Sequence, residues 1–331
     1  MISVLLMLAL PPRTLPPHWH DLGRQVRSPG SEPFAGHYCV DESGRYVYTY
    51  QLQGVDTVTG KDRTVNVFMK TEGGKQYVRF MRGGKAPPPN WFPGSAVEVF
   101  YASGNRIGAD VGSDVPGGAQ YNYFGGEVVA TVDGPAIAGA QAFDTVRAVC
   151  PSLIPAQHAG SGRLGDDPPH RLNVIEGNKT YRVPLPAKIN SVGGVFSEVD
   201  GRSGRAYILA RFGRPGAEWL AKFWEVSYKT RPPSVTSLPD PAQSGTWWRE
   251  AGDPSTIARL ADESICMRLH ATPPRLPTGM SGKFATAILD LKTRRWKLWD
   301  KLIFFGSSLN GRYVAYGWGA DPVIRIARVG P

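Results

Sequence analysis

The sequence predicts an all-β chain, and three observations lead to this prediction. Apolar-rich runs of roughly four to eight residues alternate with polar turns along most of the chain. Glycine and proline, with 39 and 29 of the 331 residues, interrupt the chain at short intervals. The stretch from Phe284 to Val329 shows the alternating spacing of strands and no helical spacing. Together these features favour many short strands over a few long helices.

The C-terminal stretch gives the clearest order of elements. Ala285 to Leu291 and Arg295 to Trp299 are apolar-rich runs on either side of the polar turn 292–294, which predicts a β-hairpin. The strands expected next are Leu302 to Gly306, Arg312 to Trp318 and Val323 to Val329, with a turn at Ser308 to Gly311. This order by itself predicts an antiparallel meander.

The beginning of the chain has the same order of parts. The strands expected there are Phe34 to Val40, Arg45 to Leu52, and a hairpin of Arg63 to Lys70 with Lys75 to Met81. ESGRYVYTY (Glu42 to Tyr50) and LNGRYVAYG (Leu309 to Gly317) match at Gly, Arg, Tyr, Val and a later Tyr. A match between such distant segments indicates an internal repeat.

Weaker copies of the repeat lie between these two. The inner strand pairs are expected at Val97 to Val111, Val195 to Phe212 and Ile257 to His270. Outer hairpins are expected to join Leu172 to Ile175 with Tyr181 to Leu185, Phe223 to Tyr228 with Ser234 to Leu238, and Ala285 to Leu291 with Trp296 to Trp299. In the third unit, Phe143 to Val149 and Pro151 to His158 are interpreted as degenerate strands. The marker residues Arg45, Arg106, Arg205 and Arg312 give a period of about 53 residues, so about six units fill the chain.

The pieces LDLKTRRWKLWD and SLNGRYVAYGW resemble blades of the broad TolB-like and WD40-like β-propeller families. The resemblance covers about Phe34 to Val329 and names no single family. It implies about six four-stranded blades, with five or seven as alternatives, arranged around a central channel. The last unit lacks a fourth strand after Val329, and we expect Leu22 to Arg27 to supply it and close the ring.

The chain is therefore divided into a signal-like or arm segment, 1–31, and a single propeller domain, 32–331. The apolar start MISVLLMLAL has no basic residues before it, and Pro11-Pro12 follows it instead of a small-residue cleavage site. Localisation stays open between export to the periplasm or exterior and retention in the cytoplasm. No run reaches the roughly 18 apolar residues of a membrane helix, so no membrane span is expected.

Charge and cysteine content limit the possible partners and cofactors. The formal charge of +10 favours anionic partners, but the basic residues are scattered, so solubility is the simpler interpretation and nucleic-acid binding is not expected. Three cysteines without CxxC spacing predict buried thiols and no structural zinc site. We expect no metal and no cofactor.

Candidate functional residues come from the innermost strands and from the aromatic residues. Glycoside hydrolysis requires two carboxylic acids flanking the scissile bond, and Glu98, Glu198 and Glu250 are the candidate acids. The candidate ligand-binding residues are His37, Tyr101, Trp248, Arg249 and Trp318. Each has a structural alternative: a hydrogen-bonded histidine, or tryptophans packed between blades.

Three functions remain open from the sequence. The preferred hypothesis is a non-enzymatic propeller that binds a protein or glycan, possibly anionic, at one mouth of the channel. The alternatives are a hydrolase or lyase acting on a carbohydrate or other small substrate in the same mouth, and a structural component of a larger assembly. Convergence of the candidate acids with His37 or an arginine would favour the enzyme.

Overall fold

The computed structural model describes the chain with gaps. The described residues are 14–27, 38–49, 51–112, 126–153, 171–184, 195–200, 202–212, 220–239, 257–270, 284–319, 321 and 323–330. Within them the chain forms antiparallel strands and a single α-helix, so the prediction of an all-β fold is confirmed.

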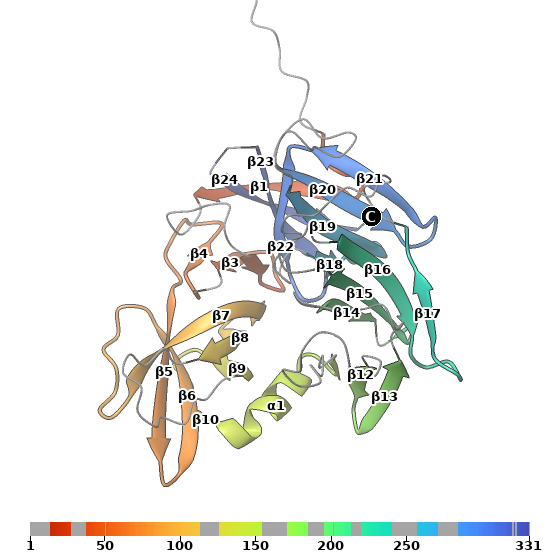
Figure 1. The fold of residues 1–331 in the computed structure, drawn as a ribbon. Helices are drawn as coiled ribbons and strands as arrows, with labels where there is room; N and C mark the ends of the chain where they lie inside the picture. Colours follow the sequence, from red (N-terminus) through yellow and green to blue (C-terminus); the bar gives the residue numbers. More distant parts are fainter. Residues whose placement is uncertain are drawn as a thin grey trace, which may run out of the picture.

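Six antiparallel sheets follow one another in sequence order around a common centre (Figure 1). The first sheet contains β2 (Tyr38–Val40), β3 (Tyr46–Thr49) and β4 (Gly54–Asp56). The second contains β5 (Val65–Glu72), β6 (Lys75–Arg82), β7 (Phe92–Ser103), β8 (Arg106–Gly112), β9 (Gly126–Thr131) and β10 (Ile137–Ala138). The third contains β11 (Ser152–Leu153), β12 (Arg171–Glu176) and β13 (Lys179–Pro184).

The last three sheets have four strands each. The fourth contains β14 (Val195–Asp200), β15 (Arg205–Phe212), β16 (Leu220–Ser227) and β17 (Ser234–Ser237). The fifth contains β18 (Ile257–Arg259), β19 (Ser264–His270), β20 (Phe284–Asp290) and β21 (Arg295–Asp300). The sixth contains β22 (Leu302–Ser307), β23 (Tyr313–Trp318), β24 (Val323–Val329) and β1 (Trp19–Arg27). This arrangement is a β-propeller, and six sheets are described. The expectation of four strands in each blade holds for the last three sheets, whereas in the described residues the second has six strands and the first and third have three.

The N-terminal strand completes the sixth sheet as predicted. β1 runs antiparallel to β24, from Trp19 opposite Val329 to Arg27 opposite Val323. Trp19 is buried, and its ring lies 6.4 Å from that of Phe304 and 6.0 Å from that of Tyr316. Backbone pairing therefore holds β1 to β24, and the packing of Trp19 holds it to β22 and β23.

The hydrophobic core is divided into layers between neighbouring sheets. One cluster joins the first sheet to the second, for example Tyr48 with Val99. Others join the sixth sheet to the first, the fifth to the sixth, and the fourth to the fifth. The fifth, sixth and first sheets lie between two such clusters and are therefore apolar on both faces, as the face-to-face packing of propeller blades requires.

Two features differ from the expected repeat. The predicted hairpin β5–β6 is present, but it belongs to the second sheet because β5 pairs with the start of β7 at Val67 to Met69. The expectation of a strand at Phe143 to Val149 is wrong, since α1 (Gly139–Arg147) occupies most of that segment. Ala142 and Val146, four residues apart, form the buried face of this helix, while Phe143 is 46% exposed.

In the described residues, α1 connects the second sheet to the third. The guanidinium of Arg147 donates to the carbonyl of Gly177 in the β12–β13 turn. From the third sheet to the fourth, Lys229 pairs with Glu176 at 2.8 Å, and the rings of Tyr181 and Tyr228 meet edge-on at 5.1 Å. Among the described residues, these contacts are a hydrogen bond, an ion pair and an aromatic pair, whereas the clusters described above connect the other sheets.

Candidate functional site

The structure describes only part of the predicted site. His37, Trp248, Arg249 and Glu250 lie outside the described residues. Glu198 lies on β14, the innermost strand of the fourth sheet, but its side chain is outside the described part as well. Trp318 lies on β23, where its ring packs edge-on against Tyr316 at 6.4 Å. Both rings are on β23, so this contact lies within one sheet and does not test packing between blades.

Glu98 and Tyr101 lie on the same strand, β7, which is the innermost strand of the second sheet. β7 contains two irregularities, one between Ala96 and Glu98 and one between Val99 and Tyr101. Each bulge inserts one extra residue and so changes which side chains share a face. As a result Val99 joins the apolar layer against the first sheet, while Glu98 and Tyr101 lie on the other face.

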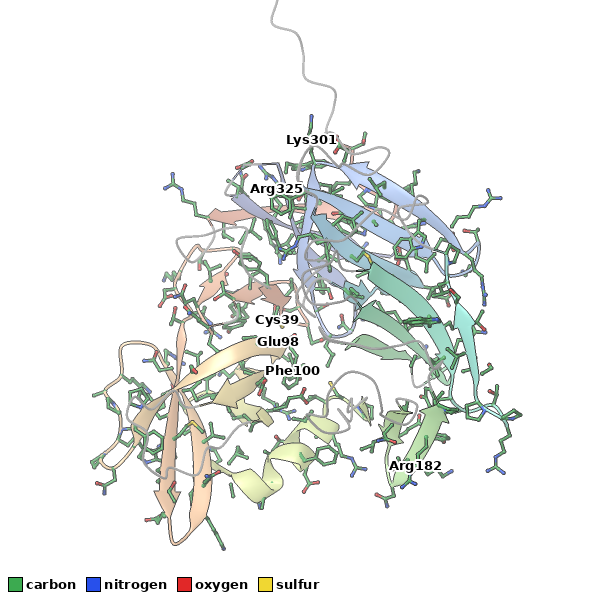
Figure 2. The ribbon with its side chains drawn as sticks, in the orientation of Figure 1. Cys39, Glu98, Phe100, Arg182, Lys301 and Arg325 are labelled. Atoms are coloured by element: carbon green, nitrogen blue, oxygen red, sulfur yellow. The ribbon has the colours of Figure 1, made fainter. Side chains whose placement is uncertain are left out.

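Three carboxylates form a row across this other face, which we call the acid row. Glu98 pairs with Asp110 of β8, and Asp110 pairs with Glu127 of β9. Directly paired residues of antiparallel strands have Cβ atoms about 4.5 to 5.5 Å apart. Burial raises the pKa of the Cys39 thiol in the first sheet, and the charges of Glu42, Asp41 and Glu98 raise it further (Figure 2).

Two carboxylates of the acid row have pKa values above their ordinary values. Burial raises the pKa of Asp110 above its ordinary value. Burial, and then the charge of Asp110, raises the pKa of Glu127, although solvent screens this effect because the Glu127 side chain is exposed. Neighbouring carboxylates with raised pKa values are suited to proton donation. Within the described residues no three His, Cys, Asp or Glu side chains are arranged to hold a metal ion.

A second candidate surface is formed by the turns that follow the innermost strands. We call it the inner-turn face, and it consists of residues 41–45, 103–106, 202–205, 261–264 and 308–312. Hydrogen bonds connect these turns from sheet to sheet: Ala261 N donates to Gly311 O at 3.0 Å, and Asn310 N to Glu42 Oε1 at 3.1 Å. Glu42 N in turn donates to Ala102 O at 2.9 Å. The fifth, sixth, first and second sheets are thus joined at one face of the ring.

Two apolar side chains are exposed beside this face. Leu309 is 40% exposed within the turn of the sixth sheet, and Val58 is 59% exposed in the turn after β4. Val58 is adjacent to Thr57, whose N–H and hydroxyl both donate to Arg45 O at 2.7 Å. Both side chains therefore project from one hydrogen-bonded set of turns in the sixth and first sheets.

Two guanidinium groups lie against one aromatic ring at the same place. Arg63 lies 4.2 Å and Arg45 5.3 Å from the centroid of the Tyr46 ring. Arg45 also pairs with the buried Asp56 at 2.8 Å, and Arg63 reaches Asn105 Oδ1 at 3.3 Å in the turn of the second sheet. These contacts hold Tyr46 and both arginines in fixed positions at a partly exposed surface.

Comparison with known proteins gives a likeness of fold alone. No family model matches the chain, and no curated protein matches it. The β-propeller domain of Cps50 (Swd1) from Myceliophteria thermophila is 10% identical, covering 94% of this chain and all of that one, with a TM-score of 0.42. A fungal alcohol oxidase of the AA5 family, in complex with copper, is 11% identical over 94% of this chain and 76% of that one, with a TM-score of 0.40.

Sequence reasoning missed several of these residues. Asp110 and Glu127 were not candidates, because their alignment with Glu98 depends on bulges that the sequence does not show. Leu309 and Tyr46 lie inside the repeated Gly-Arg-Tyr segments, which identified the repeat without showing which side chains are exposed.

No helix in the described part of the chain has the length and apolar character needed to cross a membrane.

Proposed function

We propose that this chain is a non-enzymatic binding propeller that recognises a protein partner through the inner-turn face of its sixth and first sheets. The exposed pair Val58 and Leu309 carries the proposal. Single exposed apolar residues are ordinary on protein surfaces. Here Val58 follows Thr57, which donates to the carbonyl of Arg45, and Leu309 precedes Asn310, whose N–H donates to Glu42 in the turn of the first sheet. Tyrosine and arginine beside apolar anchors are typical of the residues that dominate protein interfaces.

The third exposed large apolar side chain of the described residues provides a matched control. Phe143 is 46% exposed on α1, away from the inner-turn face. We expect Val58→Ser and Leu309→Ser to weaken capture of a partner from extracts of the native cell by about tenfold or more, and Phe143→Ser to leave it unchanged. Quantitative mass spectrometry followed by titration of the purified partner measures both effects.

Two results would contradict this proposal. One is a partner captured equally by wild type, Val58→Ser and Leu309→Ser. The other is a partner lost with Phe143→Ser alone, which would move the interface to α1. Retention of a glycan in place of a protein would keep the surface and change the class of ligand.

We propose hydrolysis of a glycan as the second candidate function, because the acid row places Asp110 between Glu98 and Glu127. A carboxylic acid with a raised pKa next to a second carboxylate is the pairing that glycoside hydrolysis uses. Asp110→Asn and Glu98→Gln are expected to abolish hydrolysis of a panel of chromogenic glycosides. The exposed Glu72→Gln on β5 controls for loss of one charge. Absence of hydrolysis by the wild-type protein across the panel would count against this function.

A further inference from the structure

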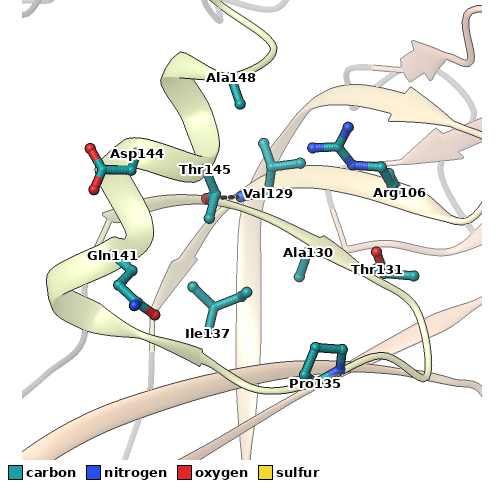
Figure 3. Close-up of a pocket in the computed structure, with 10 residues that line it drawn as sticks. All are labelled: Arg106, Val129, Ala130, Thr131, Pro135, Ile137, Gln141, Asp144, Thr145 and Ala148. Atoms are coloured by element: carbon teal, nitrogen blue, oxygen red, sulfur yellow. Dashed lines mark hydrogen bonds between the residues drawn. The ribbon is translucent and has the colours of Figure 1, made fainter.

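The outer edge of the second sheet is partly covered by a helix, at the position where the fourth, fifth and sixth sheets have a fourth strand. β9 follows β7 and β8, and α1 packs against β9 on its open side (Figure 3). The N–H of Val129 donates to Thr145 Oγ1 at 2.9 Å, and that hydroxyl donates to the carbonyl of Ala142 at 2.7 Å. A side chain of α1 thus replaces one backbone hydrogen bond of the missing strand.

Two further backbone groups of this edge point in the same direction. N–H and C=O groups of alternate strand residues face the same side, so those of Val129 and Thr131 both face away from β8. The carbonyl of Thr131 accepts from Gly134 N at 2.9 Å. In the described part of the chain, neither the carbonyl of Val129 nor the N–H of Thr131 has a hydrogen-bond partner. These two groups flank Ala130.

The geometry of the two groups selects a strand direction. In a parallel pair, one residue donates its N–H to the carbonyl before the opposite residue and accepts from the N–H after it. A single residue opposite Ala130 in a parallel strand would satisfy both groups of β9. An antiparallel strand would instead need both the N–H and the carbonyl of one residue, either Val129 or Thr131. The N–H of Val129 and the carbonyl of Thr131 are already hydrogen-bonded within this chain.

A hollow of about 430 Å³ lies at this edge. Its lining residues are Arg106, Val129, Ala130, Thr131, Pro135, Ile137, Gln141, Asp144, Thr145 and Ala148 (Figure 3). Ala130 and Ile137 form an apolar floor suited to a small side chain. Asp144 points away from Arg106 and Thr131 in Figure 3, so the two charged groups of the hollow lie at opposite ends.

The position of Arg106 indicates the charge of a neighbouring side chain. Arg106 is directly opposite Thr131, so the two side chains share a face of the sheet. Within the described residues, the exposed guanidinium of Arg106 has no side-chain partner. A residue opposite Thr131 on an added strand would have its Cα about 10 Å from that of Arg106, two strand spacings away. Glutamate and arginine side chains together span that distance.

We propose that the edge of β9 binds an extended segment of a partner protein through one residue in parallel register, opposite Ala130. Thr145 and Gly134 already occupy the adjacent hydrogen-bonding positions of this edge, so the segment turns away from β9 on either side of the residues that face Ala130 and Thr131. The segment places a small residue opposite Ala130 and an acidic residue opposite Thr131, where it pairs with Arg106. The two backbone hydrogen bonds give affinity and the side-chain positions give specificity, as in other strand-addition complexes. This site is separate from the inner-turn face, so an experiment can refute the proposal for one of them and leave the proposal for the other intact.

The test uses the peptide acetyl-Val-Ala-Glu-Val-amide as probe, with the amide resonances of Val129 and Thr131 as the readout. We expect both resonances to shift on titration. N-methylation of the peptide alanine, which removes its N–H, is expected to abolish binding. Arg106→Gln should weaken binding about three- to tenfold, and the Gln-containing peptide should lose the same amount with wild type. Arg328→Gln, an exposed arginine on β24, is the control and should bind like wild type.

Three results would overturn the proposal. One is a Thr131 amide already protected from hydrogen exchange in the free protein, which would mean that another part of this chain fills the position. Another is equal affinity of the N-methylated and unmodified peptides. The last is a shift confined to residues outside the edge of β9, which would place the peptide elsewhere.

Discussion

A single backbone position explains the repeated Gly-Arg-Tyr segment. Left-handed residues occur at equivalent places in five sheets: Gly44, Gly104, Gly204, Glu263 and Gly311, with φ between +59° and +70°. The carbonyl of that residue or of the next one accepts an N–H from the end of the sheet's third strand, at 2.7 to 3.3 Å. Glycine recurs there because it adopts this conformation without steric cost.

Two of these glycines provide a matched pair of alanine substitutions. A Cβ at Gly311 would lie 2.5 Å from the carbonyl oxygen of Arg259, in the neighbouring sheet, whereas one at Gly104 would meet nothing within 4 Å. We expect Gly104→Ala to lower the free energy of unfolding by about 1 kcal/mol, from backbone strain alone. Gly311→Ala should cost at least twice as much, because the backbone of the fifth sheet must also move. Urea unfolding measures the difference, and equal losses would contradict the close approach.

One buried carboxylate predicts a dependence of stability on pH. The Arg45 guanidinium, together with the N–H groups of Val58 and Thr59, holds the pKa of Asp56 well below its usual range. A pKa that is lower in the folded than in the unfolded chain stabilises the fold above the unfolded value, near 4, and this contribution is lost as the pH falls further. We therefore expect Asp56→Asn to cost about 1 to 3 kcal/mol at pH 7 and progressively less below about pH 4.

Urea unfolding from pH 7 down to pH 3 checks this expectation. Glu72→Gln, at an exposed carboxylate of β5, controls for the loss of one negative charge. A cost of Asp56→Asn that stayed constant over the whole range would show that the ion pair with Arg45 does not set the pKa of Asp56.

Individual strands also have specific roles, and β1 shows this most clearly. It supplies the outer strand of the sixth sheet, and the backbone of the two chain ends is joined where Gly330 N donates to His18 O at 3.1 Å. His20 Nε2 lies 2.9 Å from the carbonyl of Gly330 as well. Without β1, strand β24 would have a free edge and the apolar cluster around Trp19 would be exposed.

Deletion of residues 1–27 tests the role of β1. We expect a sharp fall in the thermal midpoint, because the deletion removes the β24 pairing and the buried Trp19 ring together. Deletion of residues 1–13, which leaves β1 intact, is the control and should leave the midpoint close to that of the full chain. Equal midpoints for both deletions would refute closure by this strand.

At the scale of the whole molecule, the described contacts between neighbouring sheets differ in kind around the ring. The fifth, sixth, first and second sheets share apolar layers and a series of turn-to-turn hydrogen bonds. Among the side chains that the structure describes in β12 and β13, Val174 and Val183 are the buried apolar ones. Its described contacts with neighbours include the Arg147, Glu176 and Tyr181 side chains. Local stability is therefore expected to vary around the ring.

Hydrogen exchange measured by mass spectrometry tests this variation. We expect β12 and β13 to exchange faster than β22 and β23, since local opening of the third sheet exposes less apolar surface. Tyr181→Ala should accelerate exchange in β12 and β13 further while leaving β22 and β23 unchanged. Uniform exchange across all sheets would indicate that the ring opens only as a unit.

The sequence alone indicated the repeat, its inner strand pairs and the outer hairpins of the later sheets. Alternating patterns and Gly-containing turns act over a few residues, so β12–β13, β20–β21 and the inner hairpins were predicted near their observed bounds. The expected closing strand, Leu22 to Arg27, also matches β1, because an incomplete last repeat requires a partner from elsewhere in the chain.

Tertiary structure alone decided the helix α1, the sheet to which β5 and β6 belong, and the alignment of the acid row. Simple counting from the Gly104-Asn105 turn places Glu98 opposite Val111, and the bulge between Val99 and Tyr101 moves it opposite Asp110. A shift of one residue exchanges the two faces of a strand. Such a shift is set by packing against neighbouring sheets, and local sequence pattern does not contain that information.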